Sequence, residues 1–423
     1  MSVPTFYRET LARVESAWHD LRFLFAPHSM SAHQISSRVH GLDSLRALAI
    51  GLVVLHHYVL FVSRAGTFGW VGEIGWVGVD LFFALSGYLI GNQIFAAMRS
   101  EEGFSLGHFY GRRLLRTLPN FYAVLALYFL VPAFRSDQTL PALWKFLTFT
   151  QNINLEPGTA FSHAWSLCIE EQFYLLLPAA ALLIAALRGA LRWAWAAVAL
   201  TLCAGMLVRG LMWHEMADAG RLAQHHYFKY IYYSSFCRFD ELVAGVALAL
   251  LKNYHAGAWR RLTARGNLAL AAGAALTALT FALFLDGRYG LAMTLFGYPM
   301  LALGFSLLIV AALSERSLLR TTRVPGAERL ALWSYAIYLI HKQVCILAAG
   351  PLADRGYGPE SLVAIGVSLA LSVLSGWVLY RLVETPFMAL RDRYLPSSAQ
   401  RAASMTSNAA GIASRKSSTA PLS

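Results

Sequence analysis

The sequence is poor in charged residues. Only 14% of its 423 residues are Asp, Glu, Lys or Arg, whereas 57% are hydrophobic. This composition excludes an ordinary water-soluble basic domain that binds nucleic acid, although 35 Lys and Arg residues exceed 23 Asp and Glu residues. Apolar runs long enough to cross a bilayer recur along the chain. We therefore expect an all-α, polytopic integral membrane protein whose surroundings are the lipid bilayer.

Cysteine is also scarce, and its positions follow no ligand spacing. The four residues stand singly, and three of them fall in or beside apolar runs: Cys168, Cys203, Cys237 and Cys345. Metal sites and disulfide frameworks need cysteines at characteristic spacings. We therefore expect no zinc site, no other metal site and no disulfide framework.

The apolar runs predict about ten transmembrane helices. The expected spans are 44–63, 76–95, 117–134, 168–187, 193–213, 238–252, 267–285, 291–313, 331–349 and 361–382. With the N-terminus in the cytoplasm, most Lys and Arg residues fall at cytoplasmic ends, as the positive-inside rule requires. Both termini are then cytoplasmic, and the outer face consists of the loops 64–75, 135–167, 214–237 and 350–360.

The two ends of the chain differ from this apolar middle. Residues 1–40 are polar and lack the apolar core and cleavage site of a signal peptide, so we expect a cytoplasmic N-terminal segment. Its aromatic residues indicate a helix over Thr5–Phe25 that lies on the membrane surface. Residues 395–423 are rich in Ser, Ala and Thr, and they predict a disordered cytoplasmic tail.

The first span carries two histidines, His56 and His57, in an otherwise apolar run that begins near Arg46. Arg46 and His57 are eleven residues apart, which is about three helical turns and places them on one face of a helix. A lone histidine in an apolar helix is often a packed, hydrogen-bonded residue. Ionisable groups within a membrane span, however, usually face a cavity or a pathway. Both interpretations of His57 are open at this point.

The second span begins with Asp80, at a depth similar to that of His57 below the outer boundary. A carboxylate there could hold the imidazole in one tautomer and stabilise its charged form. The alternative is that Asp80 only caps the start of its helix. We favour the pairing of Asp80 with His57.

Three arginines stand at the inner end of the third span: Arg112, Arg113 and Arg116. The positive-inside rule alone accounts for arginines at this place. Together with Arg46, however, their guanidinium groups could form a pocket for phosphates, which arginine binds in a bidentate way. A cytoplasmic ligand that carries phosphate would fit such a pocket.

Polar residues also gather where the fourth and sixth spans meet their outer loops. Candidates for an outer substrate site are His163, Ser166, Glu170, Glu171, Arg238 and Asp240. Each could instead belong to a structural ion pair or to a helix end, where acids are favoured. In the ninth span, His341 and Lys342 are costly in lipid and should face the cavity or a counter-ion. Glu384, at the inner end of the tenth span, is expected to be the structural partner of an arginine.

Taken in order, several pieces of the chain resemble the membrane acyltransferase-3 family from about residue 41 to 390. They are Leu42-Asp43-Ser-Leu-Arg46-Ala with His57 following, Val79-Asp80-Leu-Phe-Phe-Ala-Leu-Ser86-Gly87-Tyr88-Leu-Ile90, Arg112-Arg113-Leu-Leu-Arg116, His163-Ala-Trp165-Ser-Leu-Cys-Ile-Glu170-Glu171-Gln172-Phe-Tyr174, Ser334-Tyr335-Ala-Ile-Tyr338-Leu-Ile-His341 and Glu384-Thr-Pro386-Phe387. Each piece alone is weak, whereas the ordered set is specific. The resemblance makes 41–394 an acyltransferase-3-like transmembrane domain.

This resemblance implies an enzyme of the bacterial inner membrane that moves an acyl group, usually acetyl from acetyl-CoA, to a hydroxyl of an envelope glycan or glycolipid. Acyl-CoA is then a co-substrate, and no cofactor is bound permanently. By the same resemblance, His57 matches the catalytic histidine, Arg46 its partner, and Arg113 and Arg116 the basic motif of the third span.

For this chain, the resemblance predicts where the acyl donor and the acceptor hydroxyl bind relative to the membrane. The phosphates of acyl-CoA would stay at the inner arginines, while His57 would act as general base on the acceptor hydroxyl. Direct transfer and a transient acyl-imidazole are both open. The rival hypothesis is a transporter or flippase for a glycan or anionic substrate, in which the intramembrane His, Lys and acids relay protons.

Overall fold

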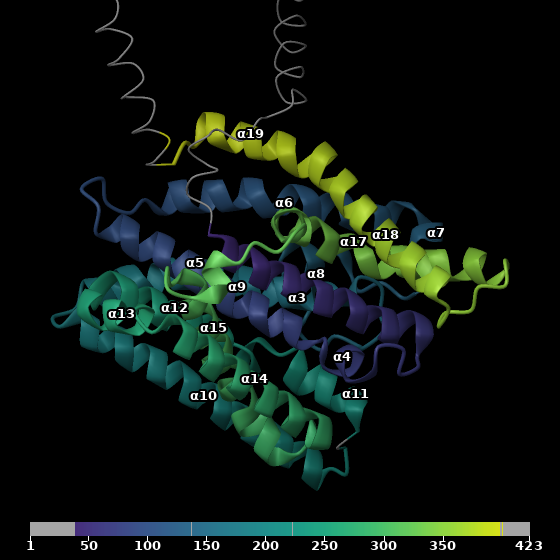
Figure 1. Ribbon diagram of the computed structural model, residues 1–423, viewed down its shortest axis with the longest axis horizontal. Coiled ribbons are helices and arrows are strands. Elements are labelled where there is room, and N and C mark those ends of the chain that lie inside the picture. Colours follow the sequence, from purple (N-terminus) through teal and green to yellow (C-terminus); the bar gives the residue numbers. More distant parts are fainter. Residues whose placement is uncertain (1–38, 137, 222, 398–399, 401–423) are drawn as a thin grey trace, which may run out of the picture. The chain divides into compact units, whose positions relative to one another are not determined.

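The computed structural model describes residues 39–136, 138–221, 223–397 and 400, and these residues form helices and no strand (Figure 1). They fall into two compact units. Of the described residues, the larger unit holds 39–104 and 124–377, and the smaller holds 105–123 and 378–400. The expected surface helix over Thr5–Phe25 and nearly all of the expected disordered tail lie outside the described residues.

The long helices of the chain are α3 (His40–Tyr58), α5 (Val77–Met98), α6 (Leu106–Leu130), α9 (Trp165–Ala185), α10 (Ala190–Asp218), α12 (Asp240–Tyr254), α14 (Gly266–Gly287), α15 (Tyr298–Leu313), α17 (Ala327–Ala353), α18 (Leu362–Leu379) and α19 (Thr385–Tyr394). Short α-helices lie between them: α4 (Gly69–Ile74), α7 (Pro132–Arg135), α8 (Leu143–Leu147), α11 (Gln224–Tyr227), α13 (Ala256–Thr263) and α16 (Leu318–Thr321). Helical turns of other types are η1 (Val59–Ser63), η2 (Ser162–Ala164), η3 (Phe228–Tyr232), η4 (Ser235–Cys237), η5 (Met293–Gly297) and η6 (Tyr380–Glu384).

Each expected span coincides with one of these helices. Within the described part of the chain, eight helices are long and apolar enough to cross a membrane. The helices α6 and α12 are not among the eight. The helix α12 has 15 residues, fewer than the roughly 20 that cross a bilayer without distortion. The multi-pass membrane fold is therefore confirmed, and the count of ten stays a prediction.

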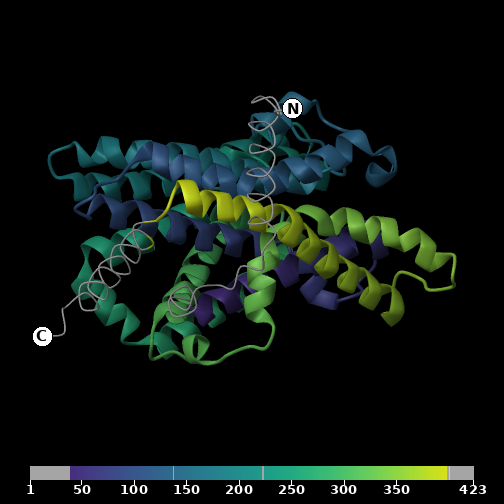
Figure 2. The ribbon, with the colours of Figure 1, turned by 90° about the horizontal axis from the view of Figure 1, so that it is seen from above.

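The interior of the larger unit is built around α3, which packs against α17, α5 and α15 (Figure 1). The helices α17 and α18 lie side by side and are joined by the loop 354–361 (Figure 2). Glycine permits the closest approach in this unit, between α5 and α12. A Cβ atom on Gly87 would overlap the carbonyl oxygen of Leu242, and one on Gly245 would overlap that of Ala84. Gly87 and Gly245 thus set the distance between these two helices.

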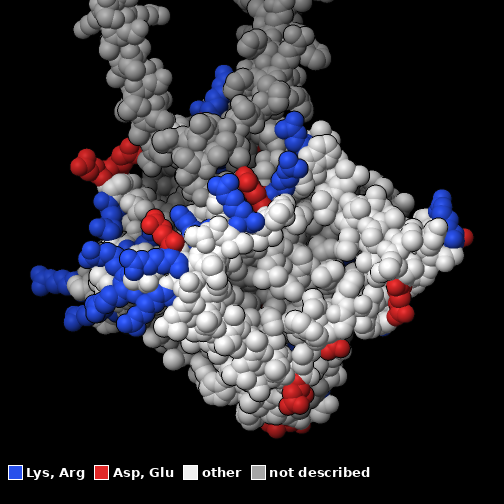
Figure 3. All heavy atoms as spheres, viewed as in Figure 1, with Lys and Arg blue, Asp and Glu red and all other residues white. Residues whose placement is uncertain are grey.

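Charge is distributed unevenly over the larger unit. Lys and Arg side chains gather near α13, whose sequence includes Arg260 and Arg261 and is followed by Arg265 (Figure 3). The helix α14 starts beside this basic end, and its last turn carries Asp286. A broad surface with few charges separates the basic and acidic regions in this view. The separation of basic from acidic residues agrees with the positive-inside rule, while the orientation of the chain in a membrane stays a prediction.

Candidate active site

The structure joins His57 on α3 to His341 on α17. Their rings lie parallel with centroids 5.0 Å apart, and His57 Nδ1 is 2.7 Å from His341 Nε2. His341 Nδ1 in turn lies 2.9 Å from the carbonyl oxygen of Ile337 and 3.0 Å from that of Tyr338. Close packing of α3 on α17 brings the two imidazoles together across 284 residues of sequence.

These contacts assign the tautomers of both rings. A carbonyl oxygen only accepts hydrogen bonds, so His341 Nδ1 carries a proton and donates it. In the neutral ring, His341 Nε2 is then the acceptor, and His57 Nδ1 must donate to it. His57 Nε2 therefore carries a lone pair, and no described residue forms a hydrogen bond with it. The arrangement gives a base with a fixed orientation, as in a catalytic triad, but with a histidine in the place of the acid.

His163 joins this pair from the 3-10 turn η2. Its ring centroid lies 5.8 Å from that of His57 and 5.5 Å from that of His341. Its Nε2 lies 3.1 Å from the carbonyl oxygen of Leu339 and donates to it, while its buried Nδ1 has no hydrogen-bond partner in the described part of the chain. The sequence predicted His163 for an outer site and His341 for the cavity. The structure places both beside His57.

A cavity of about 30 Å³ lies beside His57 and His163, which is room for about one water molecule. Its walls are Val53, His56, His57, Leu60, Phe61, Trp76, Val79, Ser162, His163, Trp165, Phe228, Tyr232 and Tyr233. Lys342 lies next to it: its Nζ donates to Thr159 O at 3.2 Å and to Ser162 Oγ at 3.1 Å, and lies 4.3 Å from the centre of the Phe61 ring. The described residues offer no group of three His, Cys, Asp or Glu side chains suited to a metal ion. The cluster is therefore interpreted through acid-base chemistry.

The predicted pairing of Asp80 with His57 is wrong. Asp80 Oδ1 accepts a hydrogen bond from Arg238 Nη2, and both side chains are fully buried. The guanidinium of Arg238 also lies over the rings of Tyr298 and Tyr232, at 4.5 Å and 4.6 Å from their centres. A buried guanidinium stays charged and needs a carboxylate. Asp80, which its depth had suggested as the partner of His57, therefore pairs with Arg238.

The other predicted outer residues do not gather into one site. Asp240 forms an ion pair with the buried Arg209, with Arg209 Nη2 3.0 Å from Asp240 Oδ1. Ser166 Oγ lies 2.6 Å from the hydroxyl of Tyr338 and is buried. Glu170 accepts from the hydroxyl of Tyr174 at 3.1 Å, and it is half-buried, as is Glu171. Ser166, Arg238 and Asp240 thus hold helices together, and a contact of Glu170 or Glu171 with substrate stays a prediction.

The two long loops that the sequence predicts for the outer face are joined to each other. Asn152 Nδ2 donates to Tyr233 O at 3.0 Å and to Ser235 Oγ at 2.8 Å. Glu156, on the same loop, accepts from Lys229, and this hydrogen bond lowers the pKa of the Glu156 carboxyl. The loops expected to select a substrate therefore form one polar surface.

The arginines predicted to bind the donor are divided between the two units. Arg46 lies on α3 in the larger unit, whereas Arg113 and Arg116 lie on α6 in the smaller unit. Their grouping into one phosphate pocket therefore stays a prediction. Within the smaller unit, Arg112 lies 3.5 Å from Asp392 of α19.

The acid at the inner end of the last predicted span also lies in the smaller unit. Glu384 accepts from the amide of Asn120 at 2.7 Å. The positive charges of Arg116 and Arg391 also act on the Glu384 carboxylate, in agreement with the expected arginine partner, and Asn120 adds a hydrogen bond.

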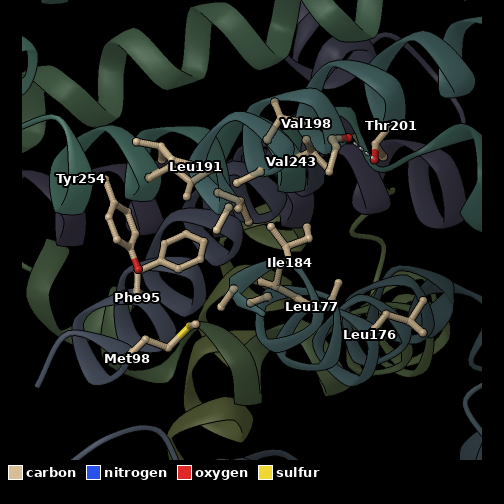
Figure 4. A pocket seen from close by; sticks show the side chains of 18 of the residues that line it. Phe95, Met98, Leu176, Leu177, Ile184, Leu191, Val198, Thr201, Val243 and Tyr254 are labelled. Carbon is tan, nitrogen blue, oxygen red and sulfur yellow. Dashed lines mark hydrogen bonds between the residues drawn. The ribbon is translucent and has the colours of Figure 1, made fainter. Parts of the chain in front are cut away.

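A much larger cavity of the larger unit is separate from this chemistry. It measures about 400 Å³ and lies between α5, α9, α10 and α12 (Figure 4). Side chains such as Phe95, Leu177, Ile184 and Val243 make its wall apolar. It shares no lining residue with the cavity beside His57. Size alone therefore does not identify the reaction centre.

Comparison with known proteins gives the family of this arrangement. The model of the acyltransferase-3 family, described as an acyltransferase domain, matches residues 39–381. The chain is 31% identical over 158 residues to the peptidoglycan O-acetyltransferase OatA of Listeria monocytogenes, a match that covers 33% of this chain and 24% of that protein. It is 34% identical over 161 residues to the O-acetyltransferase OatA of Staphylococcus aureus, again over 33% of this chain and 24% of that protein. The matches thus span about a quarter of the length of these relatives, and no solved structure matches.

Proposed function

Because the chain belongs to the acyltransferase-3 family, we propose that it is a membrane O-acyltransferase that moves an acyl group from acyl-CoA to a hydroxyl of an envelope glycan. Acetyl is the acyl group and a cell-wall glycan the acceptor that the names of the relatives favour. The observation that carries the proposal is the lone pair of His57 Nε2, held beside a cavity by the hydrogen bond from His57 Nδ1 to His341.

In the proposed reaction, His57 Nε2 takes the proton of the acceptor hydroxyl as the oxygen attacks the thioester carbon. The carbon–oxygen bond forms, the carbon–sulfur bond breaks, and the CoA thiolate leaves and takes the proton from His57 Nε2, which restores the neutral base. His341 Nε2 accepts the His57 Nδ1–H throughout and stabilises the positive charge on the His57 ring. A transient acyl-imidazole would use the same lone pair on Nε2, so this geometry serves direct and two-step transfer equally.

The proposed path crosses the membrane. Acyl-CoA comes from the cytoplasm, and its phosphates cannot enter hydrocarbon, so the nucleotide would rest against Arg46, Arg113 and Arg116. The pantetheine arm would bring the thioester up to His57. The acceptor would enter from the outer side, between the loops that Asn152 and Glu156 join. This path requires both termini in the cytoplasm and, in a bacterium, the inner membrane as the location.

The experiment is a transfer assay with the protein reconstituted in vesicles that contain lipid-linked envelope glycans. Acetyl-CoA with a labelled acetyl group is supplied on one side, and the mass of the glycans is measured afterwards. The proposal predicts glycans heavier by one acetyl group, only when acetyl-CoA is present. Movement of unmodified glycan without acetyl-CoA would instead identify a transporter and contradict the proposal.

A further inference from the structure

Arg288, the residue directly after α14, lies in a cage of aromatic rings. Its Cζ is 3.9 Å from the centre of the Trp76 ring, 5.2 Å from those of Phe228 and Tyr232, and 5.7 Å from that of Tyr289. Aromatic faces attract a guanidinium through the ring quadrupole. The cage thus fixes the position of a positive charge at the expected outer end of α14.

Among the described residues, no carboxylate forms an ion pair or a hydrogen bond with this guanidinium. Arg288 Nε and Nη2 are buried, and no hydrogen-bond partner for them exists among the residues that the structure describes. The two fully buried arginines of the larger unit differ in this respect, because Arg209 binds Asp240 and Arg238 binds Asp80. Asp80 acts on Arg288 only through space, because Asp80 accepts its hydrogen bond from Arg238. Buried donors of a charged group without partners are costly, so the site is poised for an anion.

This charge is next to the candidate active site. Three of its four rings, Trp76, Phe228 and Tyr232, also line the cavity beside His57. An anion that Arg288 binds would therefore lie against the wall of the cavity that receives the acceptor hydroxyl. Arg288 presents a planar fork of donors, which suits a carboxylate or a phosphate.

From this juxtaposition we propose that Arg288 binds an oxyanion carried by the acceptor glycan, so that the acceptor is an acidic saccharide with a carboxylate or phosphate near the acylated hydroxyl. The inference rests on the proposed function, because it assumes that the cavity beside His57 receives a glycan. The rings of Trp76 and Tyr232 would pack against the sugar, and the guanidinium would set its orientation.

The test is equilibrium binding of three sugars to the purified full chain in the absence of acyl-CoA. N-acetylglucosamine is neutral, N-acetylmuramic acid adds a carboxylate to the same ring, and N-acetylglucosamine 1-phosphate adds a phosphate. We expect at least one acidic sugar to bind the unmodified protein at least tenfold more tightly than the neutral sugar. The sugar that binds more tightly identifies the oxyanion.

The variants separate recognition from folding. Arg288→Gln should remove the preference for acidic sugars, and Arg288→Lys should keep part of it, because lysine retains the charge and loses the fork. The matched control is Arg355→Gln, since Arg355 is exposed on another predicted outer loop. Equal binding of all three sugars by the unmodified protein, or a preference that survives in Arg288→Gln, overturns the proposal. Acetyl transfer is measured separately, so absence of transfer with the preference intact would contradict the proposed function alone.

Discussion

The hydrogen bond between His57 and His341 provides the sharpest prediction, because the structure gives His341 a function that its residue type alone does not. His341 Nε2 accepts the His57 Nδ1–H at 2.7 Å. Replacing His341 by Ala removes this acceptor and leaves the N–H without a partner in the interior. The tautomer of His57 that carries its lone pair on Nε2 should then no longer be favoured over the other tautomer.

The magnitude follows from the cost of a buried donor without a partner, which is about 1–3 kcal/mol. Since 1.36 kcal/mol corresponds to a factor of ten, kcat should fall roughly 5- to 160-fold in His341→Ala. The Gln side chain carries an oxygen that can accept from Nδ1, so His341→Gln should recover part of the loss. The KM for acyl-CoA should stay unchanged in both variants, because the proposed nucleotide site is at the inner arginines.

The assay is the initial rate of acetyl transfer by the reconstituted protein, with thermal unfolding in detergent as the control for folding. A kcat for His341→Ala within twofold of the unmodified protein would refute the orienting function of His341. Equal losses in His341→Ala and His341→Gln, with normal folding, would show that the hydrogen bond is not what matters.

Three further predictions concern other parts of the chain. Asp80→Asn should lower stability, because breaking a buried ion pair costs about 3–5 kcal/mol; an unchanged melting temperature with abolished transfer would instead give Asp80 a chemical function. Arg116→Ala should weaken binding of acetyl-CoA roughly tenfold or more, since a charged hydrogen bond contributes about 1.5–3 kcal/mol, and unchanged affinity would remove Arg116 from the donor site. Cysteines introduced at Ala142 and Ala219 should react only with reagent outside the cytoplasm, and labelling from the cytoplasmic side would overturn the topology.

The helices were predictable because hydrophobic runs of membrane length carry a strong local signal. The structure has a helix at each expected span, whereas the pairing of His57 with His341 was not predicted from the sequence. The boundary and number of membrane crossings are less certain from sequence. The short helix α12 illustrates the reason: it packs between other helices of the larger unit, so its length is set by its neighbours more than by lipid.

The partner of Asp80 could not be predicted in the same way. Position along two helices gives depth, but it does not give the direction in which each side chain points. Arg238, 158 residues further along the chain, reaches Asp80 because α12 packs closely on α5. Arg288 was not predicted as a site from the sequence. The four rings around it come from separate segments, and its Nε and Nη2 have no hydrogen-bond partner among the described residues, and no local motif encodes either feature.

The central claim is that the Nε2 lone pair of His57 carries out acyl transfer, and one comparison tests it directly. Acetyl transfer from labelled acetyl-CoA is measured with His57→Ala and His56→Ala, two adjacent substitutions of the same chemistry. His56 bonds to Gly72 O through its Nδ1 at 2.7 Å, whereas His57 bonds to His341. We predict that His57→Ala abolishes transfer while donor binding and folding persist, and that His56→Ala retains substantial activity. Near-normal transfer by folded His57→Ala protein would contradict the mechanism.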